Sequence, residues 1–298
     1  MALPATRRWT YALAPLLALS MLAACSPTSE GDDGDAESSE DAIVAKVTAA
    51  ERSAVERTSI AGYTFDHLTP TGKSLFKGAV YWKSHQLEDR RYPVARMCAS
   101  NVSKVLYLGG VERYNAEGVF ALIKSVSAQG GETHRLPMPT KLASGKLDKS
   151  AFLAELNAID GGRIPTGTLV AGCATARCDA SPGSQHNAMV GNVDADGTVW
   201  IWHNNWYRPE NEGGAWKPFM IYGDDHDLYS RVGLRRQWMP TPWLRLTRDA
   251  AGTITDAESL MPAIDDMDPF GGASGGTPTY HVTMSVIPEL AAELHAQR

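Results

Sequence analysis

Hydrophobic positions recur at helical spacing through the first half of the chain. Val102, Val105 and Leu106 follow Cys98 by four, seven and eight residues, which predicts a helix that begins at Cys98 with one apolar face. The polar residues between them would occupy its other face. The same spacing predicts further helices over 43–56, 72–89, 111–127, 147–159 and 288–297, with Asp148 and Ser150 as cap candidates for the fourth.

From Gly162 onward the pattern changes to short apolar or alternating segments, which predict strands. The segments 186–193 and 198–203 are joined by Asp194-Ala-Asp-Gly197, a sequence typical of a hairpin turn. Further strands are expected over 166–172, 216–222, 242–248 and 280–287, and a loop over 265–278. Helices followed by strands predict an α+β domain in which N-terminal helices pack on a mostly antiparallel sheet.

Residues 1–25 have the features of an export signal. Arg7 and Arg8 precede an apolar segment, 11–22, which is too short to span a bilayer. The segment ends in Leu22-Ala-Ala-Cys25, which resembles the lipobox of bacterial lipoproteins, where the cysteine is lipidated. This predicts a membrane anchor at Cys25, and an ordinary signal peptide with a chance cysteine is the alternative.

Residues 26–42 contain seven acids, no base and no aromatic residue, a composition that predicts a disordered, extended tether. The whole chain has 28 bases and 34 acids. Removing Arg7, Arg8 and these seven acids leaves 26 bases and 27 acids from Ile43 onward. Residues 43–298 are therefore expected to form one nearly neutral domain, without the basic surface of a nucleic-acid-binding protein.

The positions of the four cysteines predict three different roles for them. Cys25 is assigned to lipid, and Cys173 and Cys178 lie five residues apart in a loop of small and turn-forming residues, which predicts a disulfide in an exported protein. Metal binding through this pair is less favoured, since no second Cys or His pair stands at ligand spacing. Cys98 remains as the free thiol.

The turn sets the register of the two hairpin strands. With Asp194–Gly197 in the turn, Val193 pairs with Thr198. A shift by one residue would bring in Asn204. The expected register places three polar side chains on one face: His186, His203 and Asn205.

A helix that starts at Cys98 could cover that face. A cysteine nucleophile needs a base to hold it as the thiolate and a third polar group to fix the imidazole ring. Taken singly, each histidine also fits a satisfied core or surface residue. Together with a free Cys98 at a helix start, His186 and His203 indicate a catalytic unit.

Four motifs between about residues 92 and 206 resemble the NlpC/P60 and CHAP superfamily of papain-like cysteine peptidases and amidases. They are Arg96-Met-Cys98-Ala-Ser-Asn-Val-Ser, Pro165-Thr-Gly-Thr-Leu-Val, His186-Asn-Ala-Met-Val-Gly and Trp202-His-Asn-Asn-Trp206. Met97 stands where these families carry Asp or Gln.

The resemblance implies a papain-like fold and hydrolysis of amide bonds, expected in peptidoglycan or a peptide, without metal or organic cofactor. It implies Cys98 as nucleophile, His186 as general acid and base, His203 as the orienting residue and Asn205 as an auxiliary group. The oxyanion would be bound by the Cys98 N–H and a second donor such as Tyr92. With the lipid anchor, this places a hydrolase on the exported side of a bacterial envelope membrane.

Two other classes of protein fit the sequence. One is a non-catalytic envelope lipoprotein that binds cell wall or a partner through the aromatic residues Trp200, Trp202, Trp206 and Trp216. The other is a metallohydrolase that uses His186, His203 and His226 beside Asp224, Asp225 and Asp227. Inertness of Cys98 toward iodoacetamide would favour the first class, and sensitivity of an activity to EDTA the second.

Overall fold

The computed structural model describes residues 47–86, 98–112, 126–173, 185–207, 235–261, 267–270 and 281–298. Its helices are α2 (Ala49–Arg57), α3 (Pro70–His85), α4 (Cys98–Leu108), α6 (Ser150–Ala158) and α9 (Pro288–Ala296), with a 3₁₀ turn, η1 (Asp160–Gly162). Its main strands are β1 (Glu132–Pro137), β4 (Leu169–Cys173), β5 (Gln185–Val193), β6 (Thr198–Tyr207), β7 (Arg235–Arg248), β8 (Ile254–Ser259) and β9 (His281–Val286). The chain is thus a mixed helix and sheet structure, as expected for the α+β class.

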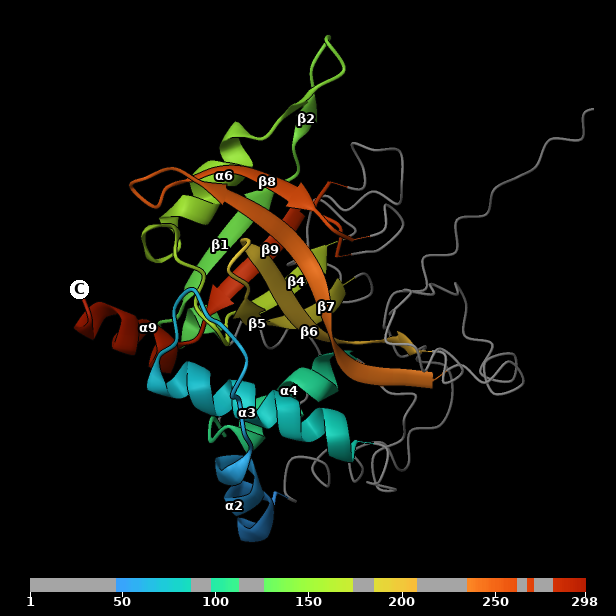
Figure 1. Cartoon of the computed structure of the whole chain (residues 1–298), viewed down its shortest axis with the longest axis vertical. Helices are drawn as coiled ribbons and strands as arrows, with labels where there is room; N and C mark the ends of the chain where they lie inside the picture. The colour runs from blue at the N-terminus through green and yellow to red at the C-terminus, as the bar shows by residue number, and fades with distance from the viewer. Residues whose placement is uncertain are drawn as a thin grey trace, which may run out of the picture.

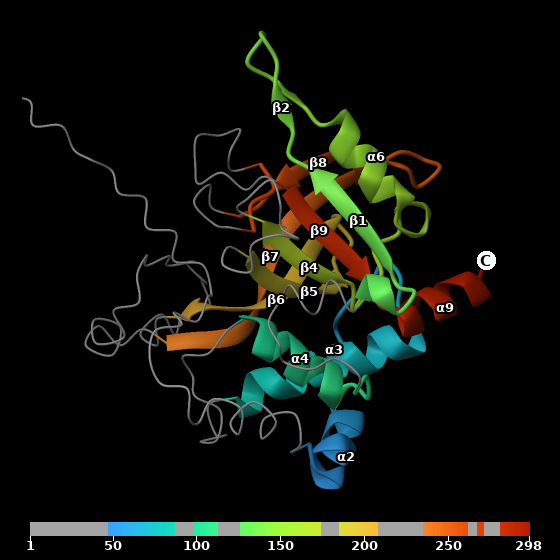
Figure 2. The same ribbon diagram turned by 180° about the vertical axis from the view of Figure 1, so that it is seen from behind.

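These strands form one antiparallel sheet in the order β1-β9-β4-β5-β6-β7-β8, and β2 (Thr140–Lys141) and β3 (Leu147–Asp148) form a separate small hairpin. Helix α6 packs against both edge strands, β1 and β8. The sheet therefore curls until its two edges approach the same helix (Figures 1 and 2).

The face of the sheet that meets α6 can be followed from strand to strand. His134 of β1 lies 3.8 Å from the Glu155 carboxylate of α6. Directly paired residues of neighbouring strands share a face. From His134, successive partners across the sheet are Met284, Val170, Ala188, His203 and Met239. We call this the inner face.

Helices α3 and α4 pack side by side on the other, outer face. Trp202 precedes His203 in β6 and so points to the opposite side. Its ring meets that of Phe76 in α3 edge to face, with 5.7 Å between centroids. Helix α4 packs on α3, β5 and β6. On the outer face of the edge strands, residues such as Arg135 and Glu258 are exposed, so the helices cover only the middle of the sheet.

Local sequence explains where several elements begin. Thr48 and Glu51 form a reciprocal capping box at α2, and Thr69 caps α3 just before Pro70 at its first position. In the β5–β6 turn, Gly197 has φ +84°, and a Cβ there would lie 2.2 Å from the Leu246 carbonyl oxygen. The predicted hairpin turn is confirmed, and it requires glycine at this position.

The helices predicted near α2, α3, α4, α6 and α9 are confirmed with shifts of boundary, as are the strands near β4, β5, β6 and β9. The predicted strand 242–248 is only the second half of β7, which begins at Arg235. The sequence interpretation missed β1 and β8, and also the small hairpin of β2 and β3, whose second strand stands where helix 147–159 was expected to begin. The polar side chains Asn101, Ser103 and Lys104 of α4 are buried, where the helix packs between its neighbours. Most of the expected helix 111–127 and loop 265–278, and all of strand 216–222, lie outside the described residues.

Candidate active site

A chain of three buried polar side chains crosses the inner face of β5, β6 and β7. Nε2 of His186 and Nδ1 of His203 are joined by a hydrogen bond of 2.8 Å. Nε2 of His203 is joined to Oγ1 of Thr241 at 2.7 Å. His203 and Thr241 are fully buried, and His186 is 9% exposed. This hydrogen-bonded series therefore runs from the protein interior to His186, the least buried of the three residues.

Burial lowers the pKa of His203 well below its ordinary value of about 6.5, and the neighbouring His186 lowers it further. His203 is thus a neutral ring at physiological pH. If its Nε2–H donates to the Thr241 hydroxyl, its Nδ1 accepts the Nε2–H of His186. His186 would then offer Nδ1 as the basic nitrogen.

The register near the histidines is the predicted one, although the pairing beside the turn is not. Ala188 pairs with His203, so His186 and His203 are diagonal neighbours on one face, as predicted. Val193, however, pairs with Val199 and not with Thr198. A bulge between Val190 and Val193 takes up the difference.

The first turn of α4 lies at the end of the sheet where β5 begins and β6 ends, which we call the histidine end. Asn101 accepts a hydrogen bond from Gln86, and Gln86 accepts the backbone N–H of Trp238. Trp238 pairs with Asn204 in β6, the residue after His203. Cys98 begins α4 one turn before Asn101, and its side chain lies outside what the structure describes.

The prediction that this helix covers the face of the histidines is wrong. Helix α4 lies on the outer face with Trp202, whereas His186 and His203 point to the inner face. Residue alternation along a strand forces this separation, because Trp202 and His203 are adjacent. Any meeting of Cys98 with His186 therefore takes place around the end of β5.

Of the other predicted site residues, Asn205 lies in β6 opposite Gln237, with its side chain undescribed. Cys173 is the last residue of β4, and its side chain is undescribed too. Three predicted residues, Cys25, Tyr92 and Cys178, lie outside the described residues, as does the tether. The sequence interpretation missed Thr241, whose only local signal is a lone hydroxyl between Pro240 and Pro242.

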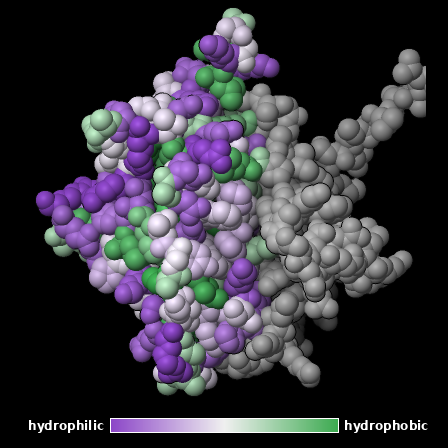
Figure 3. Space-filling view, viewed as in Figure 1, coloured by the Kyte–Doolittle hydropathy of each residue, from purple (hydrophilic) through white to green (hydrophobic). Residues whose placement is uncertain are grey.

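The structure also bears on the two alternative classes of protein. Trp202, offered as a wall-binding aromatic, is fully buried and cannot contact a partner. Among the described residues, the exposed large apolar side chains are Tyr63 and Leu142, and Figure 3 shows apolar groups scattered over the visible face. The described segments contain no group of three or more His, Cys, Asp or Glu suited to a metal ion; His226 and Asp224, Asp225 and Asp227 lie outside them.

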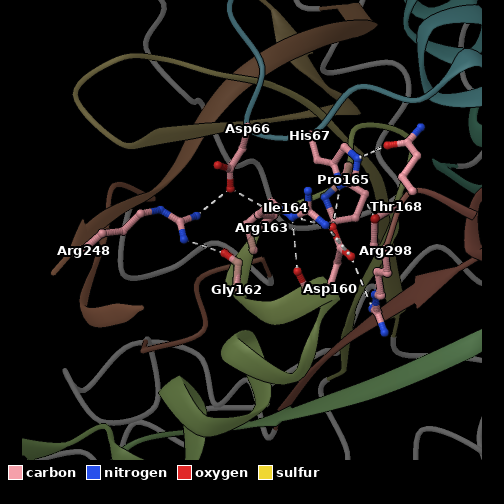
Figure 4. Close-up of polar contacts among 11 residues, drawn as sticks. Asp66, His67, Asp160, Gly162, Arg163, Ile164, Pro165, Thr168, Arg248 and Arg298 are labelled. Carbon is pink, nitrogen blue, oxygen red and sulfur yellow. Dashed lines mark hydrogen bonds and ion pairs between the residues drawn. The ribbon is translucent and has the colours of Figure 1, made fainter. Parts of the chain in front are cut away.

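A second polar cluster, drawn in Figure 4, lies near the other end of β5, which we call the hairpin end: Thr166 donates its N–H to the His67 carbonyl and its hydroxyl to the Gly191 carbonyl of β5. His67 lies between the Asp160 carboxylate, at 2.5 Å, and the Gln297 amide oxygen, at 2.7 Å. Arg163 and Arg298 also contact Asp160, at 3.0 and 3.2 Å. The buried carboxylate is thus surrounded by cationic or hydrogen-bonding groups.

No protein-family model, curated protein or solved structure matches the chain. No helix within the described ranges is both long and apolar enough to cross a membrane.

Proposed function

We propose that this protein is a papain-like cysteine hydrolase, of NlpC/P60 or CHAP type, that cleaves amide bonds in peptidoglycan. The observation that carries the proposal is the hydrogen-bonded series His186–His203–Thr241. A base that activates a thiol needs a fixed ring orientation and a fixed tautomer. A neutral His203, held by Thr241, supplies both to His186.

In the proposed reaction, His186 Nδ1 takes the proton of the Cys98 thiol, and the thiolate sulfur attacks the amide carbonyl carbon. A C–S bond forms and the C–N bond breaks, while His186 returns the proton to the leaving amine. Water then attacks the thioester, gives a proton to His186 and releases the acid and the thiol. The N-terminal end of a helix favours negative charge through the helix dipole, so the start of α4 would favour both the thiolate and the oxyanion.

The position of α4 determines where the substrate would bind in this proposal. The start of α4, where Cys98 stands, and the start of β5, where His186 stands, lie at the same end of the sheet, with α4 on the outer face and His186 pointing to the inner face. The substrate carbonyl would therefore bind beyond the end of β5, where both residues can reach it.

We further propose that Cys25 carries lipid and that residues 26–42 tether the domain to an envelope membrane. The Cys25→Ser variant should then leave the detergent phase when cells are fractionated.

The test is digestion of purified peptidoglycan sacculi by the full-length protein, with the released fragments identified by mass. The wild type should release fragments with new amine and carboxyl ends, and Cys98→Ala should release none. Both proteins are first shown to be folded by thermal unfolding. Equal release by the two proteins would rule out the cysteine mechanism.

A further inference from the structure

Gln86, the residue after α3, joins two elements at the histidine end. Its Nε2–H donates to Oδ1 of Asn101 in α4 at 3.0 Å, and its Oε1 accepts the backbone N–H of Trp238 in β7 at 2.6 Å. Asn101 Oδ1 also accepts the indole N–H of Trp82 at 2.7 Å. Gln86 and Asn101 are both fully buried.

The chemistry of the partners determines how both amides are oriented. A backbone N–H and an indole N–H can only donate, so an oxygen must face each of them. The Gln86 oxygen therefore faces Trp238, and its amino group is left to face Asn101. The Asn101 oxygen receives both remaining donors. Neither amide can turn over without leaving a buried donor unpaired, which costs about 1–3 kcal/mol.

Of the residues of the proposed reaction, Cys98 lies on α4 and Thr241 on β7, the two elements that Gln86 joins. Asn101 is three residues from Cys98 on α4. Trp238 is three residues from Thr241 on β7 and pairs with Asn204, the neighbour of His203. Helix α4 packs directly on β5 and β6, but on the face opposite to the histidines. At the end of the sheet where Cys98 and His186 would have to meet, the bonds of Gln86 fix the first turn of α4 to the backbone of β7.

We infer that Gln86 is a positioning residue, which holds the start of α4 so that the Cys98 thiol meets His186. The inference rests on the proposed function. It requires that Cys98 reacts as a thiolate at neutral pH and that this reactivity depends on Gln86. A merely structural Gln86 would affect stability alone.

The test measures the rate at which iodoacetamide alkylates Cys98 between pH 5 and 9 in the full-length protein, with the Cys98 peptide identified by mass. Gln86→Met keeps the size of the side chain and removes both hydrogen bonds. We expect the midpoint of its pH profile to move up toward the ordinary thiol value of about 8.5, and alkylation at pH 6.5 to slow about tenfold. In Gln86→Asn the side chain is too short to reach both partners, so the pH profile should shift in the same direction. This variant replaces Gln86→Met in the test if Gln86→Met does not fold.

Asn157 provides a matched control because it is also an amide that joins a helix to a strand. Its Nδ2–H donates to the Ile254 carbonyl, and its Oδ1 accepts the Ile254 N–H, far from Cys98. Asn157→Leu should lower the unfolding temperature and leave the alkylation profile unchanged. A wild-type profile in the folded Gln86 variants would overturn the inference. An ordinary thiol profile in the wild type would instead contradict the proposed function.

Discussion

His203 and His67 are both buried and hydrogen-bonded through both ring nitrogens, but their partners differ in charge. His203 lies between a second histidine and a threonine hydroxyl. His67 lies between a carboxylate and an amide, in a cluster that also holds two arginines. The first arrangement excludes formal charge from the interior, and the second concentrates it there.

The difference shows how one fold uses histidine in two ways. At the hairpin end, the buried Asp160 carboxylate depends on its donor and cationic partners, so removing its buried partner His67 leaves part of the cost of a buried charge uncompensated. At the histidine end, the neutral His203 can accept a hydrogen bond from His186 and stabilise it when it takes up a proton. We therefore expect changes at the hairpin end to lower stability, and changes at the histidine end to lower reactivity.

The largest expected effect is the difference in reactivity between a variant at the histidine end and a variant at the hairpin end. His186→Ala should reduce hydrolysis by about 10²–10⁴-fold, the usual contribution of a general base, and should slow alkylation of Cys98. His67→Ala should leave the alkylation rate of the folded protein unchanged and lower its unfolding temperature. Kinetics and thermal unfolding of both variants test this, and equal loss of alkylation in both would contradict the comparison.

A second prediction concerns the charge at the hairpin end. Asp160→Asn keeps the shape of the side chain and suits its backbone, which has φ +45°. It removes the charge that faces His67 and two arginines, so the free energy of unfolding in urea should fall by about 3 kcal/mol. Arg298→Ala is the control: half of that side chain is exposed, so its loss should cost about 0–1 kcal/mol.

The third prediction concerns Thr241. Thr241→Val removes the hydroxyl that is hydrogen-bonded to Nε2 of the buried His203, at a cost of about 1–3 kcal/mol. Hydrolysis should fall about tenfold because the His203 tautomer is no longer fixed, and the pH–rate profile should shift. Thr241→Ser keeps the hydroxyl and should restore the profile. A Thr241→Val variant that is less stable but has the wild-type profile would show a structural role only.

The smallest effect is a pH dependence of stability. The unfolded chain protonates His203 near pH 6.5, whereas the folded protein does not until a much lower pH. The unfolded state therefore binds more protons as pH falls below about 6.5, and stability from this residue is complete above that pH and lost below it. Between pH 6 and 5, the free energy of unfolding of the wild type in urea should fall by at most about 1.4 kcal/mol per pH unit more than that of His203→Gln. Parallel curves of this free energy against pH for the two proteins would contradict the prediction.

Sequence patterns predicted best what depends on neighbours in the chain. The β5–β6 hairpin follows from its turn residues, and the diagonal contact of His186 with His203 follows from its register. Even there the pairing of Val193 was wrong, because a bulge has no local signal. The strand now seen as β7 was expected to begin at Pro242, but it begins at Arg235 and contains Pro240 and Pro242, residues that are rare in a central strand. Its first part pairs only with β6, so the missing N–H groups cost no ladder bond.

The choice of face lay beyond local sequence. An apolar stripe predicted that α4 packs on a sheet, but not which side of the sheet it covers, because that depends on chain paths far from Cys98. Strands β1 and β8 were missed for a related reason. As edge strands they bury few residues, such as Leu136, Ile254 and Ala257, and expose charged ones between them. Thr241 could not be assigned before the strand order was known.

The position of β9 has a consequence for the order in which this protein assembles. This strand is made after all the others, yet it lies between β4 and β1 in the sheet. The strands from β4 to β8 can pair as a simple meander when they are synthesised, but β1 has no partner until β9 arrives. Such distant pairings slow folding, since the intervening chain must first be closed into a loop. Until then β4 presents an open edge, the form in which sheets most readily aggregate. A chain with this topology therefore depends on protection of that edge until its C-terminal strand has been made.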